Sequence, residues 1–173
     1  MSALLDGYLA QSADEAHDLE RIRALVDPWP RSTPLHVTGS AVIVHPATQR
    51  VLLRWHDRMQ GWLQVGGHAD PGESDPLAIA LREAEEETGL RDLSPWPDAR
   101  IIHVAVVPVP PGKGEPAHEH ADVRYALATD SPESIQPETE SALLKWLLIE
   151  QAIAEVGEDN LRVCLNRIAT ILV

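Results

Sequence analysis

The chain has 173 residues, enough for one domain with its own hydrophobic core and a small appendage. Apolar residues make up 44% and charged residues 24%, which excludes a disordered or collagen-like chain. The net charge of -13 argues against a nucleic-acid partner bound over a broad basic surface. No apolar run approaches about 18 residues and no basic flank opens the chain, so neither a membrane span nor a signal peptide is predicted. The single Cys164 cannot form an internal disulfide, which favours a cytoplasmic location.

The N-terminal stretch from Ser2 to Val26 has helical periodicity. Ser12 and Glu15 have the spacing of a capping box, and a glycine weakens the stretch before them, which predicts two short helices or one broken helix. A proline-rich segment then stops the helix. We therefore expect an N-terminal helical extension over residues 1–30, ahead of a main domain over residues 35–173.

The main domain begins with strand-like sequence and ends with helical sequence. Runs of β-branched and bulky residues predict strands at 37–45, 50–56, 61–65, 101–109, 122–129 and 143–148. A four-residue turn joins the first two runs, which indicates a hairpin. Helical patterns cover residues 75–90, residues 150–156 and the last segment of the chain. Strands on both sides of a central helix, with helices at the end, predict an α+β layered sandwich.

The central helix has clear start and stop signals. Asp75 is a good N-cap, Pro76 suits the first helical position, and Gly89 is the matching stop. The helical repeat places the apolar face on Leu77, Leu81, Ala84 and Thr88, and it places a set of carboxylates on the other side, at Glu83, Glu86 and Glu87.

These glutamates are electrostatically unfavourable where they stand. The C-terminal end of a helix prefers cations, and like charges one turn apart cost roughly 0.2–0.5 kcal/mol. A solvated helix face is the simplest explanation. Three carboxylates on one helical arc also form an all-oxygen site suited to Mg²⁺ or Mn²⁺. Glycines before the helix would let backbone approach a ligand closely, and a bound magnesium ion would acidify water and neutralise phosphate oxygens.

This segment resembles the signature of the Nudix hydrolases, G-x5-E-x7-R-E-U-x-E-E-x-G-U, where U is aliphatic. The matching positions are Gly67, Glu73, Arg82, Glu83, Ala84, Glu86, Glu87, Gly89 and Leu90. One departure is visible: eight residues instead of seven separate Glu73 from Arg82. The extra residue lies in the entry to the helix, so it bears on the role of Glu73 and leaves the second half of the motif intact.

The resemblance implies a Nudix-type α/β/α sandwich with a mixed sheet. It also implies Mg²⁺- or Mn²⁺-dependent hydrolysis of a pyrophosphate bond, with water attacking phosphorus, in a nucleoside diphosphate linked to another moiety. The metal ligands would be the Gly67 carbonyl with Glu83, Glu86 and Glu87, and Arg82 would orient the glutamates. The general base would be Glu86 or Glu87, or a carboxylate outside the motif, for which the candidates are Glu119, Glu138 and Glu140. The resemblance leaves the particular nucleotide open, and it includes a homodimer among the expected assemblies.

Other side chains are candidates for contact with a polyanionic substrate. Arg54 and Arg58 precede the motif, His68 follows its glycines, and Lys113 and Arg124 are further cations. His118, His120 and Asp122 alternate, so on a strand they would share one side and contact phosphate, ribose or a second metal. Each of these residues has a simpler explanation as ordinary surface. A zinc site is disfavoured by the lack of a cysteine beside the histidines.

Two other functions stay open. A Nudix-fold sensor would bind a nucleotide without cleaving it, and the intact set of glutamates argues against this. An enzyme similar to isopentenyl-diphosphate isomerase would need a cysteine in its site, whereas Cys164 lies on the apolar face of the predicted last helix.

Overall fold

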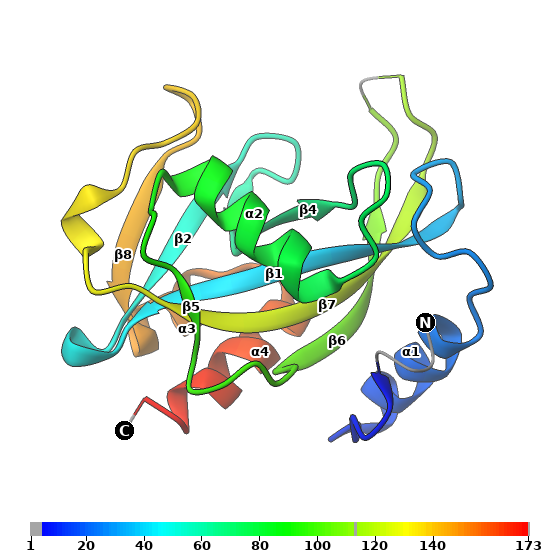
Figure 1. Ribbon diagram of the computed structural model, residues 1–173, viewed down its shortest axis with the longest axis horizontal. Coiled ribbons are helices and arrows are strands. Elements are labelled where there is room, and N and C mark those ends of the chain that lie inside the picture. The colour runs from blue at the N-terminus through cyan, green and yellow to red at the C-terminus, as the bar shows by residue number, and fades with distance from the viewer. Residues whose placement is uncertain (1–4, 113, 173) are drawn as a thin grey trace.

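The computed structural model describes residues 5–112 and 114–172, so Lys113 and the first residues of the predicted N-terminal helix lie outside the described residues (Figure 1). Within the described residues one mixed sheet is formed by β1 Leu35–His45, β2 Arg50–His56, β3 Gly61–Leu63, β4 Val65–His68, β5 Ser94–Pro95, β6 His103–Val109, β7 His118–Ala128 and β8 Leu144–Leu148. The helices are α1 Ala13–Arg23, α2 Pro76–Thr88, α3 Ile149–Glu155 and α4 Asp159–Ala169, with short 3-10 turns at Pro46–Thr48 and Pro132–Ser134.

Strand β1 is the centre of the sheet. It pairs in parallel with β7 along most of its length, and antiparallel with β2 near its end and with β4 near its start. The register places Thr38 opposite His68 on one side and His36 opposite His120 on the other. Residues that are far apart in sequence therefore meet around the first half of β1.

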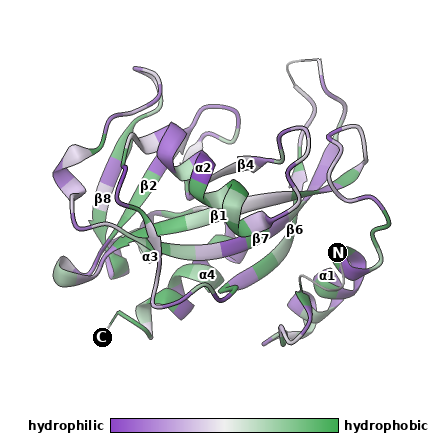
Figure 2. Cartoon of the chain, in the orientation of Figure 1, coloured by the Kyte–Doolittle hydropathy of each residue, from purple (hydrophilic) through white to green (hydrophobic). Residues whose placement is uncertain are grey.

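Two hydrophobic cores cover the two faces of this sheet. Ala41 and Ile43 belong to the core that contains α2, whereas Val42 and Val44 belong to the core that contains α3 and α4. This alternation follows from the two-residue repeat of a strand, and burial on both faces explains the apolar run over residues 41–44 of β1. Figure 2 shows the hydrophilic colour concentrated in the C-terminal turns of α2, the part of the helix that carries the glutamates. The predicted α+β sandwich is thus confirmed.

Helix α2 approaches β1 very closely. A Cβ atom on Gly39 would lie 2.3 Å from the Pro76 carbonyl oxygen and 2.9 Å from Ile79 Cβ, so a larger residue there would push the helix away. The caps are as expected: the Asp75 side chain accepts from Leu77 N at 3.0 Å, and Gly89 is left-handed. The buried face differs from the expected one. It is centred on Pro76, Ile79, Ala80, Ala84 and Thr88, with Leu77 and Leu81 partly buried, because small side chains permit the close approach.

The described part of the N-terminal segment contains one α-helix, α1, and the chain ahead of it is broken at Gly7, as the glycine predicts. Ser12 caps α1 by accepting from Glu15 N at 3.2 Å, as the capping box predicts, and residues 6–12 ahead of it form turns and irregular backbone, with Gly7 at a φ of 82°. Leu19 and Ile22 share a core with the sheet. The buried Glu15 carboxylate pairs with Arg167 of α4 at 2.7 Å. The segment is thereby tied to both the sheet and the last helix.

Other boundaries also differ from the predicted ones, and β6 starts at His103, two residues after the predicted start. The predicted strand at 61–65 is two strands, the second of which continues through the paired glycines. The first strand starts at Leu35, and β7 starts at His118, four residues before the predicted start, because parallel pairing with β1 extends it. In the described parts of the chain, no helix has the length and apolar character that a membrane crossing requires.

Candidate functional site

The glutamate-bearing face of α2 lies against the two glycines of β4. A Cβ atom on Gly67 would be 2.3 Å from the Glu83 carboxyl carbon, so the absence of a side chain there is what admits the carboxylate. Glu87 accepts a hydrogen bond from Gly66 N at 3.1 Å. Both carboxylates therefore lie beside bare backbone, the close approach expected from the glycine-rich turn.

Arg82 connects the carboxylates of the motif. Its Nε and Nη2 donate to the two oxygens of Glu73 at 3.0 and 2.9 Å, and its Nη1 donates to Glu83 at 3.0 Å and to Glu86 at 3.3 Å. Nη2 also donates to the His68 carbonyl at 2.8 Å. The guanidinium hydrogen bonds lower the pKa of Glu73. The extra residue before the helix thus leaves Glu73 in a two-point contact with Arg82.

The site carries more negative than positive charge. Four carboxylates, on Glu73, Glu83, Glu86 and Glu87, are balanced by the guanidiniums of Arg82 and Arg54 alone among the ion pairs described. Burial raises the pKa of Glu83 and raises that of Glu87 to about 7. Carboxylates held in this way, beside the backbone of two glycines, are hard oxygen donors that fit a divalent cation such as Mg²⁺.

The three candidate distal bases lie in different surroundings. Arg54 Nε lies 3.3 Å from a Glu87 oxygen, and its Nη2 lies 3.3 Å from a Glu138 oxygen. Glu138 is thereby joined to the α2 glutamates by one side chain. Glu119, at the start of β7, is held by two hydrogen bonds from Arg21 of α1. Glu140 is exposed on the loop before β8.

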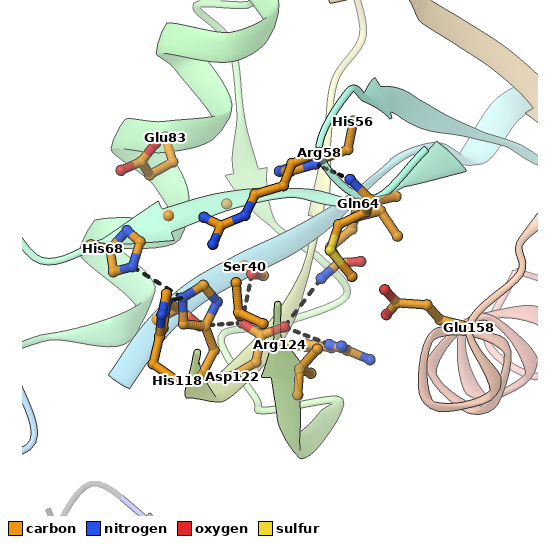
Figure 3. A pocket seen from close by; sticks show the side chains of 18 of the residues that line it. Ser40, His56, Arg58, Gln64, His68, Glu83, His118, Asp122, Arg124 and Glu158 are labelled. Atoms are coloured by element: carbon orange, nitrogen blue, oxygen red, sulfur yellow. Dashed lines mark hydrogen bonds and ion pairs between the residues drawn. The ribbon is translucent and has the colours of Figure 1, made fainter. Parts of the chain in front are cut away.

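A cavity of about 330 Å³ opens beside this glutamate cluster (Figure 3). Its volume is in the range of small-molecule sites. Glu83 and His68 lie at one end and Glu158 at the other, with Asp122 and Arg124 between them (Figure 3). Arg58 also lines the cavity and donates to Glu115 at 3.1 Å, so this candidate cation is already paired. Arg54 is not among the lining residues, although it contacts Glu87.

Asp122 is a buried anchor of the cavity floor. One of its oxygens accepts from Thr38 Oγ1 at 2.8 Å and Ser40 Oγ at 2.6 Å, and the other accepts from Gln64 Nε2 at 3.1 Å and Arg124 Nε at 2.7 Å. These partners and charges lower its pKa against the effect of burial. The Arg124 side chain is held from a second side as well, because its Nη2 donates to Asn160 Oδ1 at 2.6 Å.

The three predicted histidines gather at one wall of the cavity. His118 and His120 reach it from β7 and His68 reaches it from β4. Burial and the neighbouring histidines lower the pKa of His68 to about 3, and burial lowers that of His120 to about 4. Both rings are therefore neutral at neutral pH and offer nitrogen lone pairs instead of positive charge.

Several lining residues were not found from the sequence. They are Arg31, Thr38, Ser40 and Gln64, and His36 stands beside the histidine wall as well. Thr38 and Ser40 occupy alternate positions of the buried strand β1. Two polar side chains on the same side of a buried strand were the sequence signal that could have identified them as site residues. Arg31 stands in irregular sequence that carries no comparable signal, and Gln64 is a single polar residue within the predicted strand at 61–65.

The mixed sheet between helices, with a carboxylate-bearing helix beside a glycine strand, is the Nudix fold. A hydrolase of the NUDIX family from Clostridium perfringens has a similar structure, with a TM-score of 0.61 and 27% identity over 79% of this chain and 97% of that one. An Ap4A hydrolase from C. elegans shares the fold at a TM-score of 0.62 and 23% identity, covering 79% of this chain and 96% of that one.

The NUDIX domain model matches residues 34–165, and the chain belongs to this family. An 8-oxo-(d)GTP phosphatase from Mycolicibacterium smegmatis is 29% identical over 123 residues, which are 71% of this chain and 34% of that protein. A probable DHNTP pyrophosphohydrolase from Lactococcus lactis is 33% identical over 97 residues, which are 55% of this chain and 53% of that protein. The chain thus spans about a third to about half the length of these two relatives.

Proposed function

We propose that this protein is a Mg²⁺- or Mn²⁺-dependent hydrolase that cleaves a pyrophosphate bond in a nucleoside diphosphate linked to another moiety. The observation that carries the proposal is the excess of carboxylate charge packed against Gly67 and the open cavity next to it. The names of the matched relatives and the membership of the family agree with it. The catalytic domain would be residues 35–173, with residues 1–30 as an extension docked on it.

The metal would be held by Glu83, Glu86, Glu87 and the Gly67 carbonyl. When bound, the ion would neutralise phosphate oxygens and make a coordinated water more acidic. Arg82 would act as a positioning residue, because it fixes Glu83 and Glu86 through one nitrogen while Glu73 anchors its other side. The cavity would receive the rest of the nucleotide.

The proton of the attacking water would pass to a nearby carboxylate. Glu87 and Glu138 are the two best candidates, since Glu87 belongs to the α2 cluster and Arg54 holds Glu138 next to it. Glu119 is engaged with Arg21 and Glu140 stands on an exposed loop, so we place them behind these two. Of the predicted phosphate contacts, His68, His118, His120 and Arg58 all line the cavity. Arg58 differs from the histidines because its charge is already paired with Glu115.

The alternatives are less well supported. A silent sensor has no chemical use for a packed set of glutamates, and Glu73 keeps a two-point contact with Arg82 despite the extra residue between them. A cysteine-dependent isomerase is disfavoured because Cys164 is fully buried in α4, where burial raises its thiol pKa to about 11.

A substrate panel tests the proposal. We expect metal-dependent release of a monophosphate product or pyrophosphate from at least one member of a substrate panel. The panel contains nucleoside triphosphates with an oxidised guanine form, a pterin triphosphate, dinucleoside polyphosphates, nucleotide sugars and coenzymes. EDTA should abolish the release and excess Mg²⁺ should restore it. Tight binding of one member without turnover would support the sensor, and neither binding nor turnover across the panel would contradict both.

Metal binding should release protons near neutral pH. The pKa of Glu87 is raised from 4.5 to about 7 in the metal-free protein, so below pH 7 the ion must displace a proton from it. The apparent Mg²⁺ affinity should therefore rise as the pH increases from about 5 to above 7. The raised pKa also means that the folded metal-free protein binds the Glu87 proton more tightly than the unfolded chain does. Glu87 therefore contributes to the stability of the metal-free protein fully below pH 4.5, and this contribution is lost as the pH rises through about 7.

Titration calorimetry in two buffers with different ionisation enthalpies measures this release. Glu87→Gln should remove most of the proton release, whereas Glu85→Gln, on the same helix but paired with Arg91, should leave it unchanged. Equal proton release by Glu87→Gln and the wild type would contradict the assignment.

A further inference from the structure

Four histidines from three strands converge beside the cavity. His36 lies on β1, His68 on β4, and His118 and His120 on β7. One ring nitrogen of each lies within 4.8 Å of the corresponding nitrogen of every other. The Nε2 atoms of His68 and His120 are 3.1 Å apart, and those of His118 and His120 are 3.2 Å apart. Figure 3 shows the rings of His68 and His118 on the same wall, joined through a third ring by dashed contacts.

Backbone carbonyls orient two of these rings. His36 Nδ1 lies 2.7 Å from the Thr33 carbonyl oxygen, and His118 Nδ1 lies 2.9 Å from the Pro116 carbonyl oxygen. A carbonyl oxygen can only accept, so Nδ1 carries the proton in both rings and Nε2 carries the lone pair. A carbonyl on one ring nitrogen is also the arrangement that orients metal-binding histidines.

Hydrogen bonds alone do not satisfy this cluster. His36 is 1% exposed, and its Nε2 is buried with no hydrogen-bond partner within residues 5–112 and 114–172. The Nε2 of His118 already presents a lone pair to His120, so at most one proton can be shared among the three close nitrogens. The group therefore brings lone pairs together, and a cation at their centre would satisfy all of them.

The donor set selects the kind of cation. Imidazole nitrogen suits Zn²⁺, Cu²⁺ and Ni²⁺, whereas Mg²⁺ prefers oxygen. In a tetrahedral zinc site with Zn–N bonds of about 2.0–2.1 Å, neighbouring nitrogens are about 3.3–3.4 Å apart. The two close separations here, 3.1 and 3.2 Å, are near that value.

We propose that His36, His68, His118 and His120 form a transition-metal site, with Zn²⁺ as the expected ion, separate from the carboxylate site on α2. Four imidazoles supply a complete ligand set, so no cysteine is needed, contrary to the expectation from the sequence. The ion would tie β1, β4 and β7 together at the edge of the cavity. This inference stands whether or not the protein hydrolyses a pyrophosphate.

The first test measures Zn²⁺ binding by the full chain freed of any purification tag and stripped with EDTA. Titration against a chromogenic chelator should give one tight Zn²⁺ per chain, insensitive to millimolar Mg²⁺. His68→Ala and His118→Ala should each lower the Zn²⁺ affinity more than tenfold. His45→Ala, a histidine bonded to Thr48 outside the cluster, should leave the affinity unchanged. The pair Glu86→Gln and Glu87→Gln should leave it unchanged as well.

Spectroscopy on the unmutated protein supplies a second readout. Co²⁺ in this site should show the intense visible absorption of tetrahedral nitrogen coordination, and zinc X-ray absorption should show a nitrogen shell at about 2.0 Å with histidine scattering. Weak six-coordinate Co²⁺ bands, or Zn²⁺ binding that follows the glutamate variants instead of the histidine variants, would overturn the proposal. Because these outcomes do not involve turnover, they are distinguishable from a failure of the hydrolase assignment.

Discussion

Glu86→Gln and Glu87→Gln should each lower turnover about 10²–10³-fold, because each removes a charged oxygen ligand from the proposed metal site where phosphate charge must be stabilised. The fold should survive both changes. Glu86 is more than half exposed. Glu87 is buried with a raised pKa of about 7, so a neutral amide suits its surroundings in the metal-free protein. Steady-state kinetics on the substrate found in the panel, with saturating Mg²⁺, measures the loss.

The matched control is Glu85→Gln on the same helix. Glu85 pairs with Arg91 at 3.2 Å and has no ion pair with Arg82 or Arg54 among the described residues, so this variant should keep the wild-type rate. Glu138→Gln distinguishes Glu138 from Glu87 as the general base. If Glu138 is the base, this variant should lower kcat and leave the Mg²⁺ affinity unchanged. Full activity in both Glu86→Gln and Glu87→Gln, with Mg²⁺ affinity unchanged, would show that the metal is held elsewhere.

Arg124→Met should lower the free energy of unfolding by about 3–5 kcal/mol, because it leaves the Asp122 carboxylate buried without its charge partner. Asp122 and Arg124 are 3% and 1% exposed, and the Nε–oxygen distance between them is 2.7 Å. Protonation of Asp122 would relieve the unpaired charge. The loss of unfolding free energy in Arg124→Met should therefore become smaller as the pH is lowered. Removal of the guanidinium raises the pKa of Asp122, so the folded variant binds a proton there at a higher pH than the wild type does. Urea unfolding at several pH values measures it.

Arg100→Met is the control for removal of a guanidinium. Arg100 pairs with Asp98 on the surface, so this variant should unfold at the wild-type urea concentration at every pH. The double variant Asp122→Asn with Arg124→Met should recover part of the stability, because no buried charge remains. A single Arg124→Met as stable as Arg100→Met would mean that the buried pair does not hold the cavity floor.

Helix α2 and its glutamates could be predicted from the sequence because the information is local. The N-cap at Asp75 and the stop at Gly89 act within one turn, and the 3.6-residue repeat alone places Glu83 and Glu87 on one face. The hairpin of β1 and β2 was predicted for the same reason, since a short turn joins them. Membership of the family followed from the same contiguous segment, and the family model that matches residues 34–165 agrees with it.

The exact buried face of α2 could not be predicted, because it depends on how closely the helix meets the sheet. Periodicity ranks Leu77 and Leu81 as core residues by size. Gly39 on β1 instead admits the backbone of the helix at Pro76 and so favours small side chains at the contact. The start of β7 was missed for a similar reason, because its first residues are held by pairing with β1 and β6, and their polar alternation lacks the apolar side chains that mark a strand.

The sequence by itself determined the class of fold and the carboxylate half of the candidate site, since both are written in contiguous segments. Only the tertiary structure decided which distant side chains join them. The registers of β4 and β7 against β1 bring His36 together with His68 and His120, and the loop before β8 brings Glu138 to Arg54. Strand register is set by long-range pairing and by burial of both sheet faces, and a single local pattern contains neither.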